Sequence, residues 1–355
     1  MDLLEQLGLS VPLVQAPMAG VATPELAAAV SNAGALGSLG VGATNAEGAQ
    51  KMIKALQAAT SASFNVNVFV HKDPTPDPQI AARWCAALAP EFARFNAAPP
   101  QALQVIYKSF ANDDAMLRTL VQMAPPVVSF HFGLPDPQRI AALKQVGCLL
   151  FASATNLPEA QAAQNAGIDA IVAQGHEAGG HRGIFDPAGP DERLSTEQLT
   201  RLLTANISRP VIAAGGIMDG KDIRAALGWG AAAAQMGTAF VACPESAADA
   251  AYRTALSAAS SSANQGGTVM TPAISGRPAR CLANRFTAWA ADQTIPIPAY
   301  PTAYDAGKAL NAVAKACGEH GYGAQWAGTG AARARPMAAA ALVQTLAREL
   351  AATAA

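Results

Sequence analysis

The chain has 355 residues, enough for one barrel of roughly 250 residues and a smaller additional part. Hydrophobic residues make up 51% and charged residues 14% of the sequence, a balance that favours a folded globular enzyme and excludes a disordered chain. The formal net charge is −1, so the chain has no basic field to attract nucleic acid or an anionic membrane surface, and neither is expected as a partner.

Cysteines and the N-terminus indicate the compartment. The five cysteines are scattered and include no CxxC pair, so neither a disulfide framework nor a metal site is expected. The first ten residues, MDLLEQLGLS, lack the positive charge of a signal peptide, and Gly and Pro interrupt every apolar run before it reaches the length of a membrane span. We expect a cytoplasmic protein that is a monomer or a homodimer.

Short apolar runs alternate with helical patterns, which predicts βαβ units with parallel strands. The predicted strands are Leu13–Gln15, Ala35–Leu39, Phe64–Phe69, Val127–Phe130, Cys148–Ser153, Ala170–Ala173, Val211–Ala213 and Ala233–Met236. The predicted helices between them include Pro24–Ala33 with Thr23 as N-cap, Ala46–Ala58, Pro137–Val146, Leu157–Ala166, a helix opened by the capping box of Ser195 and Gln198, and Asp219–Trp229.

Eight such strands are the number that closes a (β/α)₈ (TIM) barrel. The alternative is an open doubly wound sheet, which normally has a glycine-rich loop after its first strand. Here the glycines cluster after strands six, seven and eight instead, which favours the barrel.

Two regions fall outside this repeat. Residues 72–126 contain two predicted helices, and residues 245–355 extend past the last strand and include a terminal helix near 336–350. We therefore expect a barrel formed by residues 1–71 and 127–244, and a smaller, mostly helical cap formed by the insert and the C-terminal extension over the barrel mouth.

The most specific motif is a pair of glycine turns, AAGGI at 213–217 and AQMGT at 234–238, each following a predicted strand. In a barrel the loops after strands seven and eight present backbone N–H groups to a phosphate, and the absence of a Cβ lets the ligand approach. Gly215, Gly216 and Gly237 are the candidate binding residues, with Thr238 as a hydroxyl donor. Ordinary tight turns are the alternative interpretation.

Two further segments follow strand ends. The run QAPMAG at 15–20 places a Pro-Met turn after strand one, where its backbone can meet a flat ring. The loop QGHEAGGHRG at 174–183 follows strand six and carries His176 and His181, of which His181 is the candidate for proton chemistry or for polarising a substrate. Their spacing in a glycine loop does not indicate a metal pair.

Taken together, these segments resemble the nitronate monooxygenase family, formerly called 2-nitropropane dioxygenases, and in particular its bacterial class I group. The resemblance implies a non-covalently bound FMN and the oxidation of alkyl nitronates such as propionate 3-nitronate by O₂, which detoxifies them. It makes His181 the catalytic residue beside the flavin. The FMN-binding residues that it implies are Gln15, Ala16, Pro17, Met18, Asn67, Gln174, Gly179, Gly180, Gly215, Gly216, Gln235, Met236, Gly237 and Thr238.

The same resemblance implies a substrate pocket with tyrosines and a lysine. The matching residues are Tyr107, Tyr252, Tyr300, Tyr304 and Lys308, and His131 at the end of strand four is a further candidate for substrate or flavin contact. With an anionic nitronate, these donors and a protonated His181 would bind charge; with a neutral nitroalkane, His181 would act as general base.

Three alternatives stay open at this point. An FMN-dependent NAD(P)H:quinone reductase shares this barrel, and the tyrosine–lysine set argues against it; an enoyl-thioester reductase of the same superfamily is the second alternative. A barrel that binds a phosphate ligand without catalysis would need neither His181 nor the tyrosines.

Overall fold

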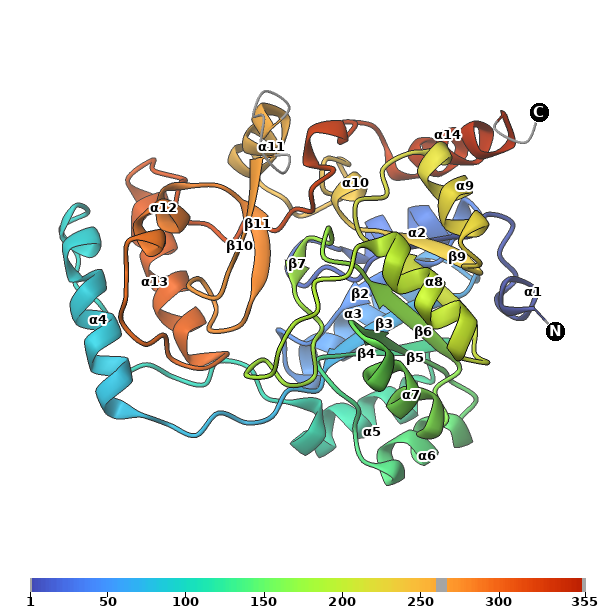
Figure 1. Ribbon diagram of the computed structural model, residues 1–355, viewed down its shortest axis with the longest axis horizontal. Coiled ribbons are helices and arrows are strands. Elements are labelled where there is room, and N and C mark those ends of the chain that lie inside the picture. The colour runs from blue at the N-terminus through green and yellow to red at the C-terminus, as the bar shows by residue number, and fades with distance from the viewer. Residues whose placement is uncertain (1, 260–266, 353–355) are drawn as a thin grey trace.

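The computed structural model describes residues 2–259 and 267–352, which form a parallel barrel with a smaller cap over one end (Figure 1). The barrel strands are β1 (Leu13–Gln15), β2 (Gly37–Gly40), β3 (Phe64–Phe69), β4 (Val127–His131), β5 (Leu149–Ala154), β6 (Ala170–Gln174), β8 (Val211–Ala214) and β9 (Ala233–Met236). The sheet order is β1-β9-β8-β6-β5-β4-β3-β2, with every neighbouring pair parallel.

The ring closes between β1 and β2. Val14 forms a parallel bridge to Leu36, and the amide of Gln15 donates to the Leu36 carbonyl at 2.9 Å. The predicted (β/α)₈ barrel and all eight of its strands are therefore confirmed. The second strand begins later than predicted because Leu36 pairs only through this bridge.

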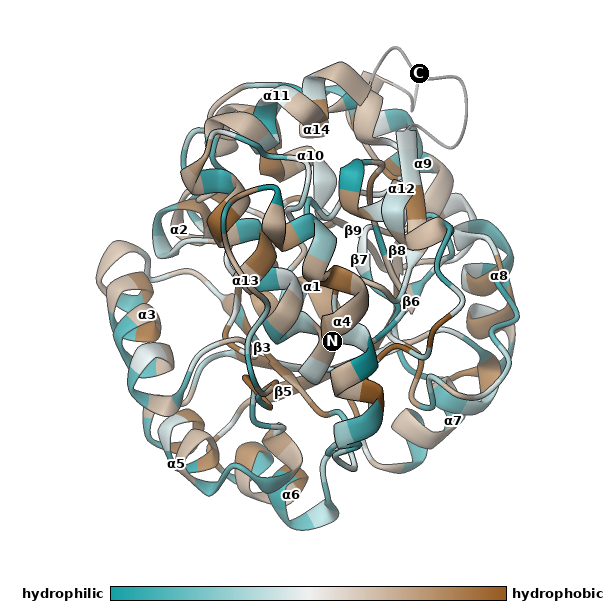
Figure 2. Ribbon diagram, turned by 90° about the vertical axis from the view of Figure 1, so that its left-hand side faces the viewer, coloured by the Kyte–Doolittle hydropathy of each residue, from teal (hydrophilic) through white to brown (hydrophobic). Residues whose placement is uncertain are grey.

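Helices surround the barrel (Figure 2). They are α2 (Pro24–Asn32), α3 (Ala46–Ala59), α5 (Asp114–Met123), α6 (Pro137–Gln145), α7 (Leu157–Asn165), α8 (Thr196–Asn206) and α9 (Gly220–Gly228). Their starts follow local chemistry. The Thr23 side chain accepts the Leu26 amide, and Ser195 and Gln198 form the predicted capping box.

Two helices expected in the cap pack on the barrel instead. In α5, Met116 and Leu120 share a core with Ile53 of α3, so α5 is the barrel helix between β3 and β4. In α14 (Ala339–Ala352), Leu342 and Leu346 pack with residues of α2 and α9, so this last helix fills the eighth position of the ring. The predicted division, which gave 72–126 and 245–355 wholly to the cap, differs from this packing because an apolar helical face does not reveal its partner.

The cap is built from α4 (Pro78–Ala93), α12 (Arg285–Ala291), α13 (Thr302–Ala316) and a small sheet. Trp84 and Phe92 of α4, Phe286 of α12 and Leu310 of α13 form its core. The shorter connecting elements are η1 (Phe110–Asn112), α10 (Thr238–Val241), α11 (Ala250–Ala258) and η4 (Ala331–Arg333).

The cap sheet joins cap and barrel. Its strands β10 (Thr268–Thr271) and β11 (Ala279–Leu282) pair antiparallel, and β11 also pairs with β7 (Gly180–His181), which belongs to the loop after β6. The expectation of a mostly helical cap did not include this sheet, because strands of two to four residues are too short for an alternating pattern to stand out. His181 is consequently held in a strand rather than in an irregular loop.

The opposite end of the barrel is closed by α1 (Leu3–Leu7). Leu3 and Leu7 pack against the interior residues Val14, Val172 and Ile212. Figure 1 shows α1 and the cap at opposite ends. The open end is therefore the one where the strands terminate, as in other barrels of this type. Within residues 2–259 and 267–352, no helix is both long and apolar enough to cross a membrane.

Candidate active site

A cavity of about 590 Å³ lies at the C-terminal ends of the barrel strands, beneath the cap. This volume falls within the range of small-molecule sites, roughly 300–1,000 Å³. Among the described residues, no group of three or more His, Cys, Asp or Glu side chains could hold a metal ion. Of the residues predicted from the sequence, those lining the cavity are Ala16, Pro17, Met18, Asn67, Tyr107, His131, Gln174, Gly179, Gly180, His181, Gly215, Gly216, Gln235, Met236, Gly237, Thr238, Tyr252, Tyr300, Tyr304 and Lys308.

Gln15 is the predicted residue that does not line the cavity. It is completely buried, its side-chain oxygen accepts the Ser38 amide at 2.8 Å, and its side-chain nitrogen donates to the Ala16 carbonyl. Its side chain therefore links β1 to β2 through a hydrogen bond. The sequence places it beside the cavity, but the alternation of side chains along β1 directs it to the face opposite that of the interior residue Val14.

The two glycine turns lie side by side because β8 and β9 are neighbours, with Ala214 paired to Gln235. Gly216 has φ +69°, a conformation that L side chains rarely adopt, and a Cβ on Gly237 would meet only the side chains of Ala16 and Met18, at 3.4 and 3.8 Å. Within the described part of the chain, the amides of Gly216 and Gly237 have no hydrogen-bond acceptor. Unpaired amides at adjacent strand ends are typical of a site for a phosphate group.

A third glycine-containing segment, residues 326–330, lies beside the two glycine turns and was not predicted from the sequence. The Gly328 amide donates to Thr238 Oγ1 at 3.0 Å, which leaves the Thr238 hydroxyl proton available to a ligand. A Cβ on Gly179 would lie 2.4 Å from the Gly328 nitrogen, so these two backbones need glycine to approach each other. The run WAGTG is glycine-rich, but it follows no barrel strand, and only the return of the chain from the cap brings it here.

His181 lines the cavity, and Ser275 contacts its ring. His181 Nε2 lies 2.9 Å from Ser275 Oγ, and the Ser275 hydroxyl donates its proton to the Arg277 carbonyl at 3.2 Å. With its proton on the Arg277 carbonyl, Ser275 accepts from Nε2–H, which leaves the lone pair on Nδ1. Burial, with smaller contributions from His131 and Arg277, lowers the pKa of His181 well below 6.5. The imidazole is neutral near pH 7 and has Nδ1 as its basic atom.

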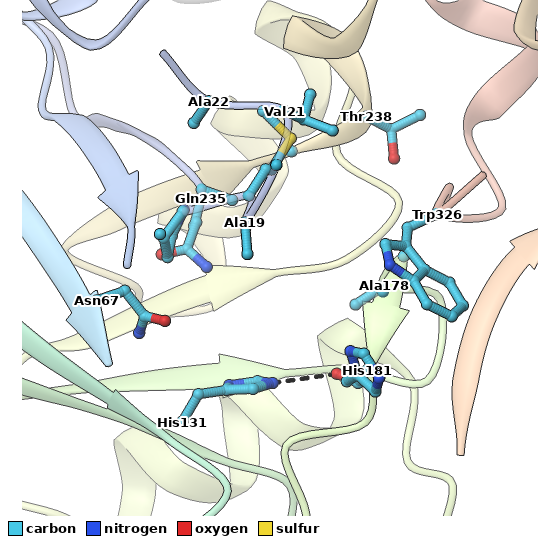
Figure 3. A pocket seen from close by; sticks show the side chains of 18 of the residues that line it. Ala19, Val21, Ala22, Asn67, His131, Ala178, His181, Gln235, Thr238 and Trp326 are labelled. Carbon is cyan, nitrogen blue, oxygen red and sulfur yellow. Dashed lines mark hydrogen bonds between the residues drawn. The ribbon is translucent and has the colours of Figure 1, made fainter. Parts of the chain in front are cut away.

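His131 and Gln174 line the cavity, but their polar atoms hold the backbone of His181. His131 Nε2 donates to the His181 carbonyl at 3.1 Å (Figure 3), and His131 Nδ1 accepts from Ser153 Oγ at 2.8 Å. Gln174 donates to the same carbonyl at 2.9 Å and accepts the Gly183 amide at 2.7 Å. Burial lowers the pKa of His131 to about 4. The contacts expected of these residues with flavin or substrate thus compete with bonds inside the protein.

The tyrosine–lysine set converges on the cavity from the insert and the C-terminal extension. Lys308 Nζ donates to the Tyr107 hydroxyl at 2.8 Å and lies 5.8 Å from the centre of the Tyr304 ring. The Tyr300 hydroxyl is buried and has no partner among the described residues, and burial raises its pKa well above 10. Tyr300 is therefore a neutral donor available to a ligand.

Tyr252 lines the cavity, and its hydroxyl is bonded within the protein. Its hydroxyl donates to the Trp326 carbonyl, so it braces the third glycine segment. Trp326 itself lines the cavity with its ring centre 4.9 Å from that of His181, and Figure 3 shows the two side by side. Neither Trp326 nor Ser275 was predicted as a site residue, because each is brought to His181 only by the cap.

Asn67 and Gln235 supply side-chain amides to the opposite wall (Figure 3). The Asn67 nitrogen donates to the Ser129 carbonyl at 3.1 Å and to Ser129 Oγ at 2.9 Å, which leaves the Asn67 oxygen as an acceptor. The cavity therefore has hydrogen-bonding groups for the edge of a flat heterocycle at one side and a neutral imidazole at the other.

Comparison with known proteins agrees with this geometry. Residues 2–349 match the model of the nitronate monooxygenase family. A nitronate monooxygenase of Paraburkholderia phytofirmans is 58% identical over 98% of this chain and 94% of its own length, and one of Pseudomonas aeruginosa is 50% identical over 97% of each chain.

Among solved structures, that of a nitroalkane oxidase from Streptomyces ansochromogenes superposes with a TM-score of 0.89 at 39% identity and covers 99% of both chains. The likeness thus extends over barrel and cap together. The resemblance predicted from the sequence motifs is confirmed: this chain is an enzyme of the nitronate monooxygenase family.

Proposed function

We propose that this enzyme binds FMN in the cavity and oxidises alkyl nitronates, such as propionate 3-nitronate, with O₂. The observation that carries the proposal is the convergence of two unpaired glycine amides and a neutral imidazole on one cavity. In the cell this activity would detoxify nitronates.

The residues fit FMN in three places. Gly215, Gly216, Gly237 and Thr238 offer a phosphate several N–H groups and a hydroxyl without a Cβ in the way. The side chains of Asn67 and Gln235 offer hydrogen bonds to the polar edge of the isoalloxazine, and Ala16–Met18, Gly179 and Gly180 supply apolar or backbone surface around it. When bound, FMN supplies the redox chemistry, in which electrons leave the nitronate and reach O₂.

The protein's own groups recognise the substrate. A nitronate carries its negative charge on two oxygens, and Lys308, Tyr107 and Tyr300 supply a cation and hydroxyl donors at the cavity wall. Charge-assisted hydrogen bonds are stronger in a cavity with little water. Because Nδ1 of His181 is unprotonated, this residue is suited to accept a proton from the α-carbon of a neutral nitroalkane rather than to bind the anion as an imidazolium.

Two relatives are named nitronate monooxygenases, and the solved structure is that of a nitroalkane oxidase. Both the anionic nitronate and the neutral nitroalkane are therefore compared as substrates. The NAD(P)H:quinone and enoyl-thioester reductase alternatives need no cluster of tyrosines around a lysine. A barrel that only binds a phosphate ligand gives no reason for a buried Tyr300 hydroxyl without a partner in the described structure. Nitronate oxidation accounts for both features.

The test is a ranking of activities on one preparation. Purified protein should be yellow and should release FMN on denaturation. With propionate 3-nitronate it should consume oxygen at a rate that exceeds, by about a hundred-fold or more, its oxidation of NADH with a quinone; such a ratio corresponds to about 3 kcal/mol in the barrier. Faster NADH oxidation would select the reductase, and a colourless protein that takes up no FMN would reject the flavoenzyme.

A further inference from the structure

A buried guanidinium lies directly behind the substrate side of the cavity. Arg277 is 3% exposed, and its nitrogens donate to the backbone carbonyls of Ile184 and, at 3.5 Å, Arg182. Among the described residues, no carboxylate lies within 4.0 Å of it. Burial lowers the pKa of Arg277 only to about 10, so it remains a cation at neutral pH. Burying a charge without an ion-pair partner reduces the stability of the folded protein, so a functional role for Arg277 is expected.

The ring of Phe132 lies between this cation and two residues that line the cavity. The guanidinium carbon of Arg277 lies 4.2 Å from the centre of the Phe132 ring. The same ring lies 5.5 Å from that of His181 and 5.4 Å from that of Tyr300, both of which line the cavity. Phe132 has φ +79°, which is strained for a bulky side chain, and such strain is retained mostly at functional sites.

Arg277 has a different charge environment from its buried neighbour Arg182. Arg182, its buried neighbour, is neutralised by Asp191 at 2.9 Å. The carboxylates of Glu159 and Asp186 act on Arg277 from beyond ion-pair distance, so they offset its charge only in part. After the larger effect of burial, Arg277 is among the charges that hold the pKa of His71, His131 and His181 low. Its field therefore reaches His181, which lines the cavity.

From this arrangement we infer that Arg277 sets the charge selectivity of the cavity: it is a specificity-determining residue that favours an anionic nitronate over the neutral nitroalkane without touching either. The inference rests on the proposed function. At an effective dielectric constant of about 20, a unit charge roughly 8–10 Å away changes the affinity for a monoanion by about ten- to thirty-fold.

The experiment compares Arg277→Gln, which removes the charge but can still donate to the Ile184 carbonyl, with Arg277→Lys, which keeps it. Arg139→Gln is the matched control, because Arg139 is also buried and lies over an aromatic ring, Phe110, but is paired with Asp114 and Asp136 on the outside of the barrel. In each flavin-loaded protein, calorimetry measures the dissociation constants of nitrate, a planar anion, and of neutral nitroethane under anaerobic conditions. Steady-state assays then give KM for ethyl nitronate.

We expect Arg277→Gln to weaken nitrate binding and raise KM for ethyl nitronate about ten- to thirty-fold, while nitroethane binding changes less than about two-fold. Arg277→Lys and Arg139→Gln should keep the wild-type ratio of nitrate to nitroethane affinity. An unchanged nitrate affinity in folded Arg277→Gln, or an equal loss for nitrate and nitroethane, would overturn the inference.

If Arg277→Gln does not fold, Arg277→Met takes its place with the same expected ratio. A wild-type enzyme that consumes no oxygen with any nitronate would refute the proposed function itself. An active wild type whose neutral variants keep the nitrate preference would refute only the role of Arg277.

Discussion

His181 is fixed at two points that belong to different parts of the residue. His131 and Gln174 hold its backbone carbonyl, and Ser275 holds its ring nitrogen Nε2. The backbone bonds come from barrel strands, whereas Ser275 comes from the cap. A proton acceptor must meet its substrate in one tautomer and one direction, and this pair of constraints supplies both.

Ser275→Ala tests the ring constraint. Without its acceptor, Nε2–H no longer determines the tautomer, and we expect kcat to fall about ten-fold with little change in KM. The ¹⁵N resonances of labelled His181 should shift toward a mixture of tautomers, which a purely structural loss would not produce. Ser31→Ala is the control, since Ser31 is a buried, hydrogen-bonded serine outside the cavity. Wild-type kcat and wild-type resonances in the Ser275→Ala variant would contradict this assignment.

The buried histidines make stability depend on pH. His71 is 2% exposed, and burial lowers its pKa from 6.5 to about 4. Below pH 6.5 the unfolded chain binds a proton that the folded protein excludes, so stability falls as the pH drops toward 4. At pH 5 this amounts to about 2 kcal/mol for His71.

His71→Phe removes that proton-binding group, so the stability lost between pH 7 and pH 5 should be about 2 kcal/mol smaller than in wild type. Urea unfolding at the two pH values measures the difference. The exposed His320, changed to Gln, should leave the loss as it is in wild type. Equal losses in wild type and His71→Phe would show that His71 is not excluded from protonation in the folded state.

At the scale of the elements, the ends of the barrel strands and the loops that return to them supply most of the residues of the site. The sequence could predict the eight barrel strands, since their apolar runs are buried on both faces, and the two glycine turns that follow β8 and β9. It could not predict β7, because a two-residue strand exists only through its pairing with β11. Nor could it reveal that Gln174 and His131 bond to His181, since those bonds depend on where the loop returns.

Gly237→Val tests whether the glycine turn after β9 forms part of the proposed phosphate site. A Cβ at this position meets only the side chains of Ala16 and Met18, at 3.4 and 3.8 Å, so the fold should tolerate valine while its methyl groups fill the space proposed for the phosphate. We expect a folded protein whose FMN dissociation constant, measured by equilibrium dialysis, rises about ten-fold or more, equivalent to at least about 1.4 kcal/mol.

Gly228→Ala in α9, where no atom lies within 4 Å of the new Cβ, should keep wild-type FMN affinity. If the Gly237→Val variant also retained wild-type affinity, the phosphate would have to bind elsewhere.

At the scale of the whole molecule, the chain crosses between barrel and cap several times. The insert sends α4 into the cap and returns α5 to the barrel, and the C-terminal extension builds α12 and α13 before α14 closes the helical ring. Composition and periodicity predict helices in these regions but not whether each packs on the barrel or in the cap. The amphipathic patterns of α4, α5 and α14 do not identify the surface that each helix packs against. The cavity is the product of this crossing, with the glycine turns from the barrel and Ser275, Tyr300 and Trp326 from the cap.

The most direct measurement of the central claim uses His181→Asn in parallel with wild type. If a neutral imidazole held between barrel and cap performs the reaction's proton chemistry beside a bound flavin, the variant should retain its FMN and its thermal stability, while kcat with a neutral nitroalkane, whose α-carbon must lose a proton, falls about a hundred-fold or more. A variant that keeps both flavin and wild-type turnover with every substrate would contradict the account.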